Sequence, residues 1–201
     1  MFSRFCAMFV RIFYIFFALV FAAQAYAKDN ISFYHKTGRE EPAQGLHMSL
    51  FSIKDAMKAY LGRWRGEQSV FLLNGEKVSS FKVEQSFTAA GESELAMTVK
   101  FELPNGKNVF SQWKIEDLGS VMRMSLIDES GKPAPKYIGR VQLSGVSWEP
   151  VYCVLAYDVM FDSFERGADG FLYFISTSYS TLFDGKASGI LRGKSVLKKI
   201  L

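Results

Sequence analysis

The alternation of apolar and polar residues along three stretches of this chain limits its possible folds more than any other feature. In residues 81–87, 95–103 and 109–115, the odd positions are mostly apolar and the even positions mostly polar. Successive side chains of a β-strand point to opposite faces, so each stretch has one face for a core and one for solvent. The pattern predicts half-buried antiparallel strands.

Turn residues separate these stretches at regular intervals. Six glycines recur every 12 to 16 residues, at Gly75, Gly91, Gly106, Gly119, Gly131 and Gly145. The Asn74-Gly75 and Asn105-Gly106 pairs favour type I′ hairpin turns, in which both central residues have positive φ. We therefore expect a meander in which each strand is joined to the next by a tight turn.

Long strands with short connections favour a barrel. Strands of about ten residues would each be roughly 33 Å long, and such strands in sequence fit a closed up-and-down barrel better than a sandwich. More apolar segments follow at 151–160, 171–179 and 190–197, which brings the expected total to roughly nine strands. Residues 162–170 are expected to form the longest irregular piece.

A short helix is expected before the first strand. Leu50, Ile53, Met57 and Leu61 recur at helical spacing with charged residues between them, which predicts an amphipathic helix within 49–61. The predicted fold class is all-β: an antiparallel up-and-down meander that closes into a β-barrel and is preceded by this helix. Residues 49–201 are expected to form a single barrel domain.

The first 27 residues have the pattern of a secretory signal. They contain Arg4 and Arg11, an apolar run from Ile12 to Ala23, and the ending Ala25-Tyr26-Ala27. The uncharged run of 12 residues is shorter than the roughly 20 that a membrane-spanning helix needs. We expect cleavage after Ala27, no transmembrane helix in the mature chain, a flexible leader over 28–48, and a periplasmic or extracellular location.

Charge and cysteine content exclude some classes of function. Loss of Arg4 and Arg11 with the signal lowers the net charge from +4 to +2, which gives little electrostatic support for binding nucleic acid. Cys153 is the only cysteine outside the signal, so no intrachain disulfide can form. It lies in an apolar stretch and is interpreted as a small buried side chain.

The triplet Gly62-Arg63-Trp64, directly after the expected helix, resembles the G-x-W signature of the lipocalin and wider calycin barrels. The resemblance implies a lipocalin-like barrel in which Trp64 closes one end and a basic side chain from the last strand, Arg192, packs over its ring. This role is structural. The chain departs from the lipocalin pattern because it has no second sequence motif and no helix after the last strand.

Few residues suit catalysis. His35 and His47 are the only histidines and both precede the barrel, so neither a histidine triad nor a histidine metal site is expected. An acidic group at Asp158, Asp162, Glu165 and Asp169 is interpreted as a solvated loop, with acid–base catalysis or calcium binding as alternatives. No cofactor and no metal is expected, and the protein is predicted not to be an enzyme.

The inward face of the expected barrel is the candidate ligand-binding site. Its lining residues would be Phe81, Val83, Gln85, Phe87, Met97, Val99, Phe101, Ser111, Trp113, Met122 and Met124. They could simply fill a core, or they could line a pocket in which Gln85 and Ser111 orient a ligand.

The leading hypothesis for function is an exported, non-enzymatic binder or carrier of a small apolar molecule or lipid. Alternatives are a structural or interaction module of the cell envelope with a filled core, a small outer-membrane barrel, and an enzyme that uses the acidic group.

Overall fold

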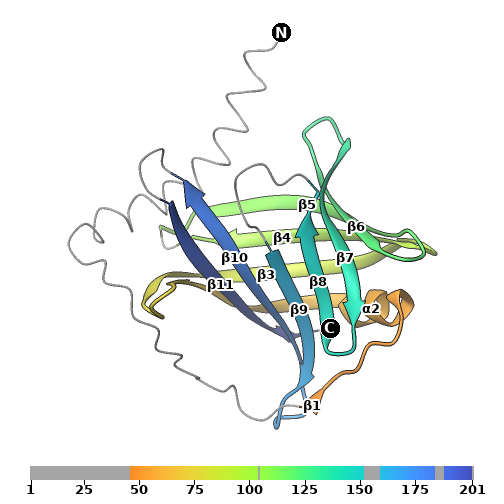
Figure 1. The fold of residues 1–201 in the computed structure, drawn as a ribbon, viewed down its shortest axis with the longest axis horizontal. Helices are drawn as coiled ribbons and strands as arrows, with labels where there is room; N and C mark the ends of the chain where they lie inside the picture. Colours follow the sequence, from red (N-terminus) through yellow and green to blue (C-terminus); the bar gives the residue numbers. More distant parts are fainter. Residues whose placement is uncertain (1–45, 104, 152–158, 184–187, 201) are drawn as a thin grey trace.

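The protein is described by a computed structural model that covers residues 46–103, 105–151, 159–183 and 188–200 (Figure 1). The expected signal sequence, most of the expected leader, Cys153 and Asp158 lie outside the described residues. Two residues of that leader, Leu46 and His47, form the short strand β1, which pairs with β9.

Ten antiparallel strands form a closed barrel, and β1 is an additional strand outside it. Each barrel strand pairs with its neighbours in sequence, and the last strand, β11, pairs with the first, β2. The prediction of an up-and-down barrel is therefore confirmed, with one strand more than the roughly nine expected. The strands are β2 (Gly62–Leu72), β3 (Lys77–Gly91), β4 (Glu94–Glu102), β5 (Asn108–Asp117), β6 (Met122–Ile127), β7 (Pro133–Gln142), β8 (Gly145–Pro150), β9 (Val159–Arg166), β10 (Leu172–Phe183) and β11 (Ser188–Lys199).

The predicted alternation sets the two faces of the sheet. Val83 lies opposite Phe101 on β4, and Met97 lies opposite Trp113 on β5. Directly opposed residues of antiparallel strands share a face, so the predicted apolar positions all point into the barrel. The polar positions between them carry ion pairs on the outside, such as Lys82 with Glu102 and Lys114 with Glu94.

The type I′ turns expected at the Asn-Gly pairs are not formed. Gly75 has φ of 89°, whereas no described residue other than glycine has positive φ. The amide of Gly75 donates to the carbonyl of Leu72, and the amide of Leu72 donates to the carbonyl of Glu76. This is a three-residue loop with its glycine in the left-handed region. The same pair of hydrogen bonds recurs at residues 103–107, 128–132 and 167–171.

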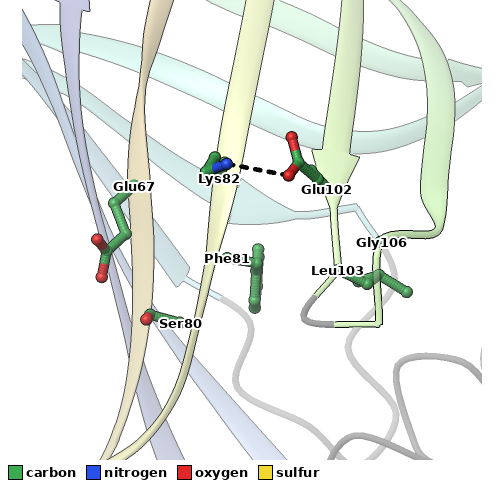
Figure 2. A pocket seen from close by; sticks show the side chains of 7 residues that line it. All are labelled: Glu67, Ser80, Phe81, Lys82, Glu102, Leu103 and Gly106. Atoms are coloured by element: carbon green, nitrogen blue, oxygen red, sulfur yellow. Dashed lines mark hydrogen bonds and ion pairs between the residues drawn. The ribbon is translucent and has the colours of Figure 1, made fainter.

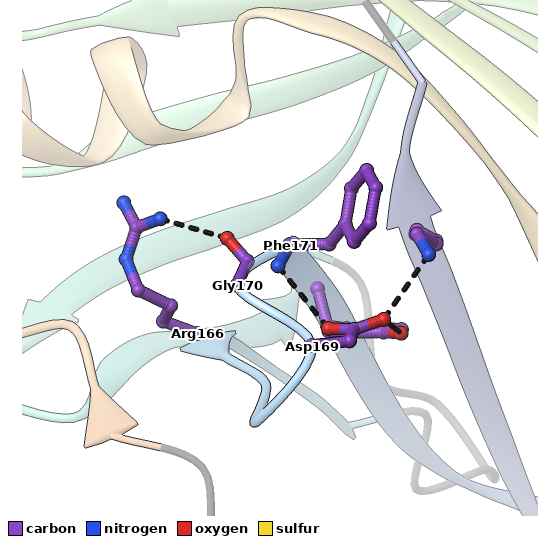
Figure 3. A network of polar contacts seen from close by, with 6 residues as sticks. Arg166, Asp169, Gly170 and Phe171 are labelled. Atoms are coloured by element: carbon purple, nitrogen blue, oxygen red, sulfur yellow. Dashed lines mark hydrogen bonds and ion pairs between the residues drawn. The ribbon is translucent and has the colours of Figure 1, made fainter.

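The turn between β9 and β10 is fixed by Asp169 (Figure 3). Its carboxylate accepts hydrogen bonds from the Phe171 amide at 3.1 Å, the Tyr173 hydroxyl at 2.7 Å and Lys198 Nζ of β11 at 3.1 Å. Arg166 donates to the carbonyl of Gly170 across the same turn. The turn is thereby tied to the neighbouring strand β11.

The expected irregular piece at 162–170 is mostly strand. β9 continues to Arg166, and Asp162 points into the barrel in the row of Val146 and Ser176. The interpretation of Asp162 as part of a solvated loop is therefore wrong, because Asp162 is buried and a buried carboxylate needs hydrogen-bond partners. The structure supplies those partners from distant parts of the chain.

The predicted helix is present as α2 (Ile53–Tyr60), which lies against one end of the barrel (Figure 1). Ser52 caps it, because the Ser52 hydroxyl accepts a hydrogen bond from the Asp55 amide. Ala56, Met57, Ala59 and Tyr60 are buried in the barrel core. Gly62, with φ of 119°, then turns the chain into β2, which requires a backbone conformation that favours glycine.

Candidate functional site

The barrel interior is packed at the end that α2 covers. The Tyr60 ring contacts Phe87, Phe164 and Phe174 with centroids 5.0 to 5.7 Å apart, and Trp64 Nε1 donates a hydrogen bond of 2.7 Å to the Tyr60 carbonyl. Trp64 is fully buried. The helix and the first strand therefore close this end together.

The basic side chain over Trp64 is Lys199, and the expectation of Arg192 is corrected. Lys199 lies opposite Trp64 in the pairing of β11 with β2, and its Nζ is 5.2 Å from the ring centroid. Arg192 lies opposite Phe71 and packs over that ring at 4.9 Å. The two basic residues are an odd number of positions apart, so they point to opposite faces of the strand.

A buried polar network links the helix to two strands. Asp162 of β9 is 5% exposed. Its Oδ2 accepts a hydrogen bond of 2.6 Å from the Tyr60 hydroxyl and one of 2.8 Å from Trp148 Nε1 of β8. Its Oδ1 is buried and has no hydrogen bond of good geometry from the described residues. Ser176 of β10 lies opposite Asp162 in the strand pairing, but no described donor reaches Oδ1 with good hydrogen-bond geometry.

Burial dominates the protonation of this network. It raises the pKa of Asp162 above its ordinary value, although the hydrogen bonds from Tyr60, Ser176 and Trp148 act in the opposite direction. Burial, followed by the charge of Asp162, raises the pKa of Tyr60 well above its ordinary value. Tyr60 therefore remains a hydrogen-bond donor at neutral pH.

Toward the other end of the barrel, inward-pointing side chains remain accessible to solvent. Among the predicted lining residues, Val83, Phe87, Met97, Val99, Met122 and Met124 are buried, whereas Phe81, Gln85, Phe101, Ser111 and Trp113 are only partly buried. A side chain that points into a closed barrel and still contacts solvent borders accessible interior space. We call this part of the interior the open half.

The two predicted polar groups of the lining differ in their partners. The Ser111 hydroxyl accepts a hydrogen bond of 2.9 Å from Trp113 Nε1, so it orients the indole ring. Gln85 Oε1 is buried and has no hydrogen-bond partner among the described residues. Of the two, Gln85 is the one with a free acceptor.

Sequence reasoning missed the polar residues of β10, β11 and β2 that also point inward. Asp162 pairs with Ser176, Ser176 with Ser195, and Ser195 with Gln68, so one row of inner positions crosses four neighbouring strands. The spacing of Ser176, Ser178 and Ser180, every second residue, was the available signal. We call Asp162, Ser176, Ser178, Ser195 and Gln68 the polar wall.

A shallow groove of about 380 Å³ lies along β2 and β3 beside the turn that joins β4 to β5 (Figure 2). Its charged lining residues are already paired, Lys82 with Glu102 at 3.0 Å and Glu67 with Lys77 at 2.8 Å. We assign it no binding role. The remaining lining residues are Ser80, Phe81, Leu103 and Gly106.

Other kinds of site are not indicated in the described part of the chain. No three His, Cys, Asp or Glu side chains among residues 46–103, 105–151, 159–183 and 188–200 lie where they could hold a metal ion. In those same ranges, no helix combines the length and apolar character that a membrane crossing requires.

No known family and no curated protein matches the chain. A solved structure of a redesigned β-barrel aligns with 73% of this chain and 96% of its own, at 12% identity and a TM-score of 0.32. That likeness is too distant to carry an argument. The chain is a closed antiparallel β-barrel, and no family match supports the lipocalin resemblance in particular.

Proposed function

We propose that the protein is an exported, non-enzymatic binder or carrier of a small apolar molecule, which it holds in the open half of the barrel. The observation that carries the proposal is the partial exposure of inward-pointing Phe81, Phe101 and Trp113. Aromatic surface that stays in contact with water inside a barrel favours an apolar ligand that would displace that water.

The ten-strand barrel supports the proposal through its size. Barrels of about eight strands are just wide enough for side chains to fill or for one small ligand to enter. A barrel with more strands is wider, and here α2 and the aromatic residues of the packed end fill one half of it. On this proposal the ligand occupies the other half, where the inward-pointing Phe81, Phe101 and Trp113 are only partly buried.

The ion pairs on the outer surface argue against the alternative of a small outer-membrane barrel. Arg63 and Arg65 both pair with Glu84, Glu116 pairs with Arg123, and Arg140 pairs with Glu149. A transmembrane barrel presents an apolar band to lipid and polar residues to its interior. This barrel has the opposite distribution along β2 to β8, so its geometry favours an aqueous environment.

The acidic residues give little support to the enzyme alternative. Asp162 is bound by Tyr60 and Trp148, Asp169 holds a turn, and Glu165 lies 3.2 Å from His47. Glycoside hydrolysis needs two carboxyl groups that face a shared substrate space. Asp169 and Glu165 instead serve contacts on the outside of the barrel.

The test uses the uncharged fluorescent probe N-phenyl-1-naphthylamine with the mature protein. Ser111 points into the open half, whereas its neighbour Gln112 is exposed on the outside of β5. We expect Ser111→Phe to weaken binding at least about tenfold, because the added ring occupies the ligand space. Gln112→Phe adds the same ring outside and is expected to leave the affinity unchanged.

Circular dichroism verifies that both variants are folded. Absence of saturable probe binding to the unmodified protein, together with native mass spectra that stay free of ligand after incubation with a lipid extract, would reject the proposal. Equal loss of binding in both variants would place the probe outside the open half.

A further inference from the structure

The interior of the barrel has two walls of different chemistry. In a closed barrel of ten strands, each strand faces the strand five places away around the sheet. β9, β10 and β11 therefore face β4, β5 and β6. The first group carries most of the polar wall, and the second carries Met97, Val99, Phe101, Trp113, Met122 and Met124.

The polar groups converge where a glycine makes room for them. A Cβ atom on Gly193 of β11 would lie 2.4 Å from Ser178 Oγ and 3.5 Å from Gln68 Nε2. The two side chains thus approach the Gly193 backbone from the strands on either side, β10 and β2. Any larger residue at this position would push the Ser178 hydroxyl aside.

One member of the polar wall lacks a partner that its burial demands. Asp162 Oδ1 is buried without a hydrogen bond of good geometry from the described residues, and the side chain is 5% exposed. A buried acceptor without a well-placed donor lacks the hydrogen bond that water would give it in the unfolded chain. A ligand that brings a donor to this atom supplies that hydrogen bond, whereas a ligand that brings a carboxylate meets repulsion and a second desolvated acceptor.

We propose that the ligand is amphipathic: an apolar body packs against β4, β5 and β6, and hydroxyl groups along one edge donate to Asp162 Oδ1 and bond with the serines of the polar wall. This inference rests on the proposed binding function and gives the ligand its chemical class. Hydroxyl groups suit the wall because Ser176, Ser178 and Ser195 can each donate and accept.

The test compares three probes that share one apolar body: naphthalene, 2-naphthol and 2-naphthoate. Binding to the mature protein is measured by equilibrium dialysis. One net hydrogen bond contributes about 0.5 to 1.5 kcal/mol, so 2-naphthol should bind roughly 2- to 12-fold more tightly than naphthalene. The carboxylate of 2-naphthoate should make it the weakest of the three.

Variants assign the preference to the polar wall. Ser178→Ala should reduce the preference for 2-naphthol over naphthalene, whereas Ser86→Ala, on the outer face of β3 between Gln85 and Phe87, should leave it unchanged. Asp162→Asn replaces one acceptor by an amide donor and should improve the binding of 2-naphthoate relative to 2-naphthol. If Asp162→Asn does not fold, Ser178→Ala still decides the question.

The outcomes separate this inference from the function on which it rests. If all three probes bind saturably with equal affinity, the polar wall does not determine which ligand is preferred. The inference would then be wrong, and the proposed binding of apolar molecules would stand. A preference for 2-naphthol that persists in Ser178→Ala and Asp162→Asn would also overturn the inference. Failure of every probe to bind would reject both proposals.

Discussion

The hydroxyl of Tyr60 donates a hydrogen bond of 2.6 Å to Oδ2 of Asp162, a residue 102 positions later in the chain. Tyr60 ends α2 and Asp162 lies in the middle of β9, so this contact fixes the helix to the barrel wall from the inside. Trp148 Nε1 of β8 donates to the same oxygen at 2.8 Å. Three elements therefore meet at one buried carboxylate oxygen.

Removal of the Tyr60 hydroxyl should destabilise the fold. In Tyr60→Phe the buried Asp162 loses a donor, and we expect the free energy of unfolding to fall by about 1 to 3 kcal/mol. Urea denaturation measures the change. Tyr173→Phe is the matched control, because that hydroxyl donates to the exposed Asp169 and its loss should lower the free energy of unfolding much less. Equal effects in the two variants would contradict the role of Tyr60.

The stability of the fold should depend on pH through Asp162. Burial raises the pKa of Asp162 above the ordinary 3.8 that it has in the unfolded chain. The folded state then holds this proton more tightly, so the free energy of unfolding contributed by Asp162 falls as pH rises from the unfolded toward the folded pKa. Asp162→Asn lacks this contribution.

Urea titrations of both proteins over the acidic to neutral range isolate the effect. We expect the stability of the unmodified protein relative to Asp162→Asn to decrease with rising pH and then to level off. Glu84 and Glu116 have lowered pKa values because of their arginine partners and act with the opposite sign, but they are present in both proteins and cancel in the difference. A difference that increases with pH would contradict the prediction.

Gly139 makes room for a tryptophan of the core. A Cβ on Gly139 of β7 would lie 2.6 Å from Cζ3 of Trp148, which is 1% exposed. We expect Gly139→Ala to lower the free energy of unfolding by about 1 to 3 kcal/mol through overpacking. At Gly91 the nearest atom to an added Cβ is 3.9 Å away, so Gly91→Ala should stay within about 0.5 kcal/mol of the unmodified protein.

The cation–π contact of Lys199 with Trp64 should contribute to stability and to the emission of Trp64, whereas Arg192 should not affect that emission. Replacing Lys199 by Leu removes the cation 5.2 Å from the indole centroid and should lower the free energy of unfolding by about 0.5 to 1 kcal/mol. It should also shift the fluorescence emission of Trp64. Arg192→Leu acts on Phe71 and should leave that emission unchanged; a shift in Arg192→Leu alone would contradict the assignment.

The prediction that residues 1–27 are a secretory signal can be tested directly. Expression of the full chain in a bacterial host should yield a periplasmic protein that begins at Lys28, since cleavage is expected after Ala27. Intact mass and amino-terminal sequencing of the osmotic-shock fraction check this. Recovery of an uncleaved chain in the membrane fraction would indicate that the apolar segment is retained.

The barrel could be predicted because the alternation that marks a strand is contained in a short stretch of sequence. The alternation around Val83, Met97 and Trp113 needs only the chain itself, and the structure places all three on the inner face. The prediction of type I′ turns was wrong because the type of turn depends on how the two strands are paired. Asn74 favours positive φ in isolation, but the hairpin places only Gly75 there.

The candidate site needed information that no single stretch of sequence contains. Whether Asp162 is a loop residue or a buried acceptor depends on Tyr60 and Trp148, which the fold brings to it. Whether Arg192 or Lys199 covers Trp64 depends on the register of β11 against β2, and a shift of one residue exchanges the two faces.

The pairing of β11 with β2 gives every barrel strand two neighbours, so none of the ten has an unpaired edge. A chain that stopped after β10 would expose the backbone amides and carbonyls of β2 and β10 at the same time. Such edges recruit strands from other molecules. Residues 188–199 therefore remove the edges at which the folded barrel could pair with other molecules, a contribution that is independent of any ligand.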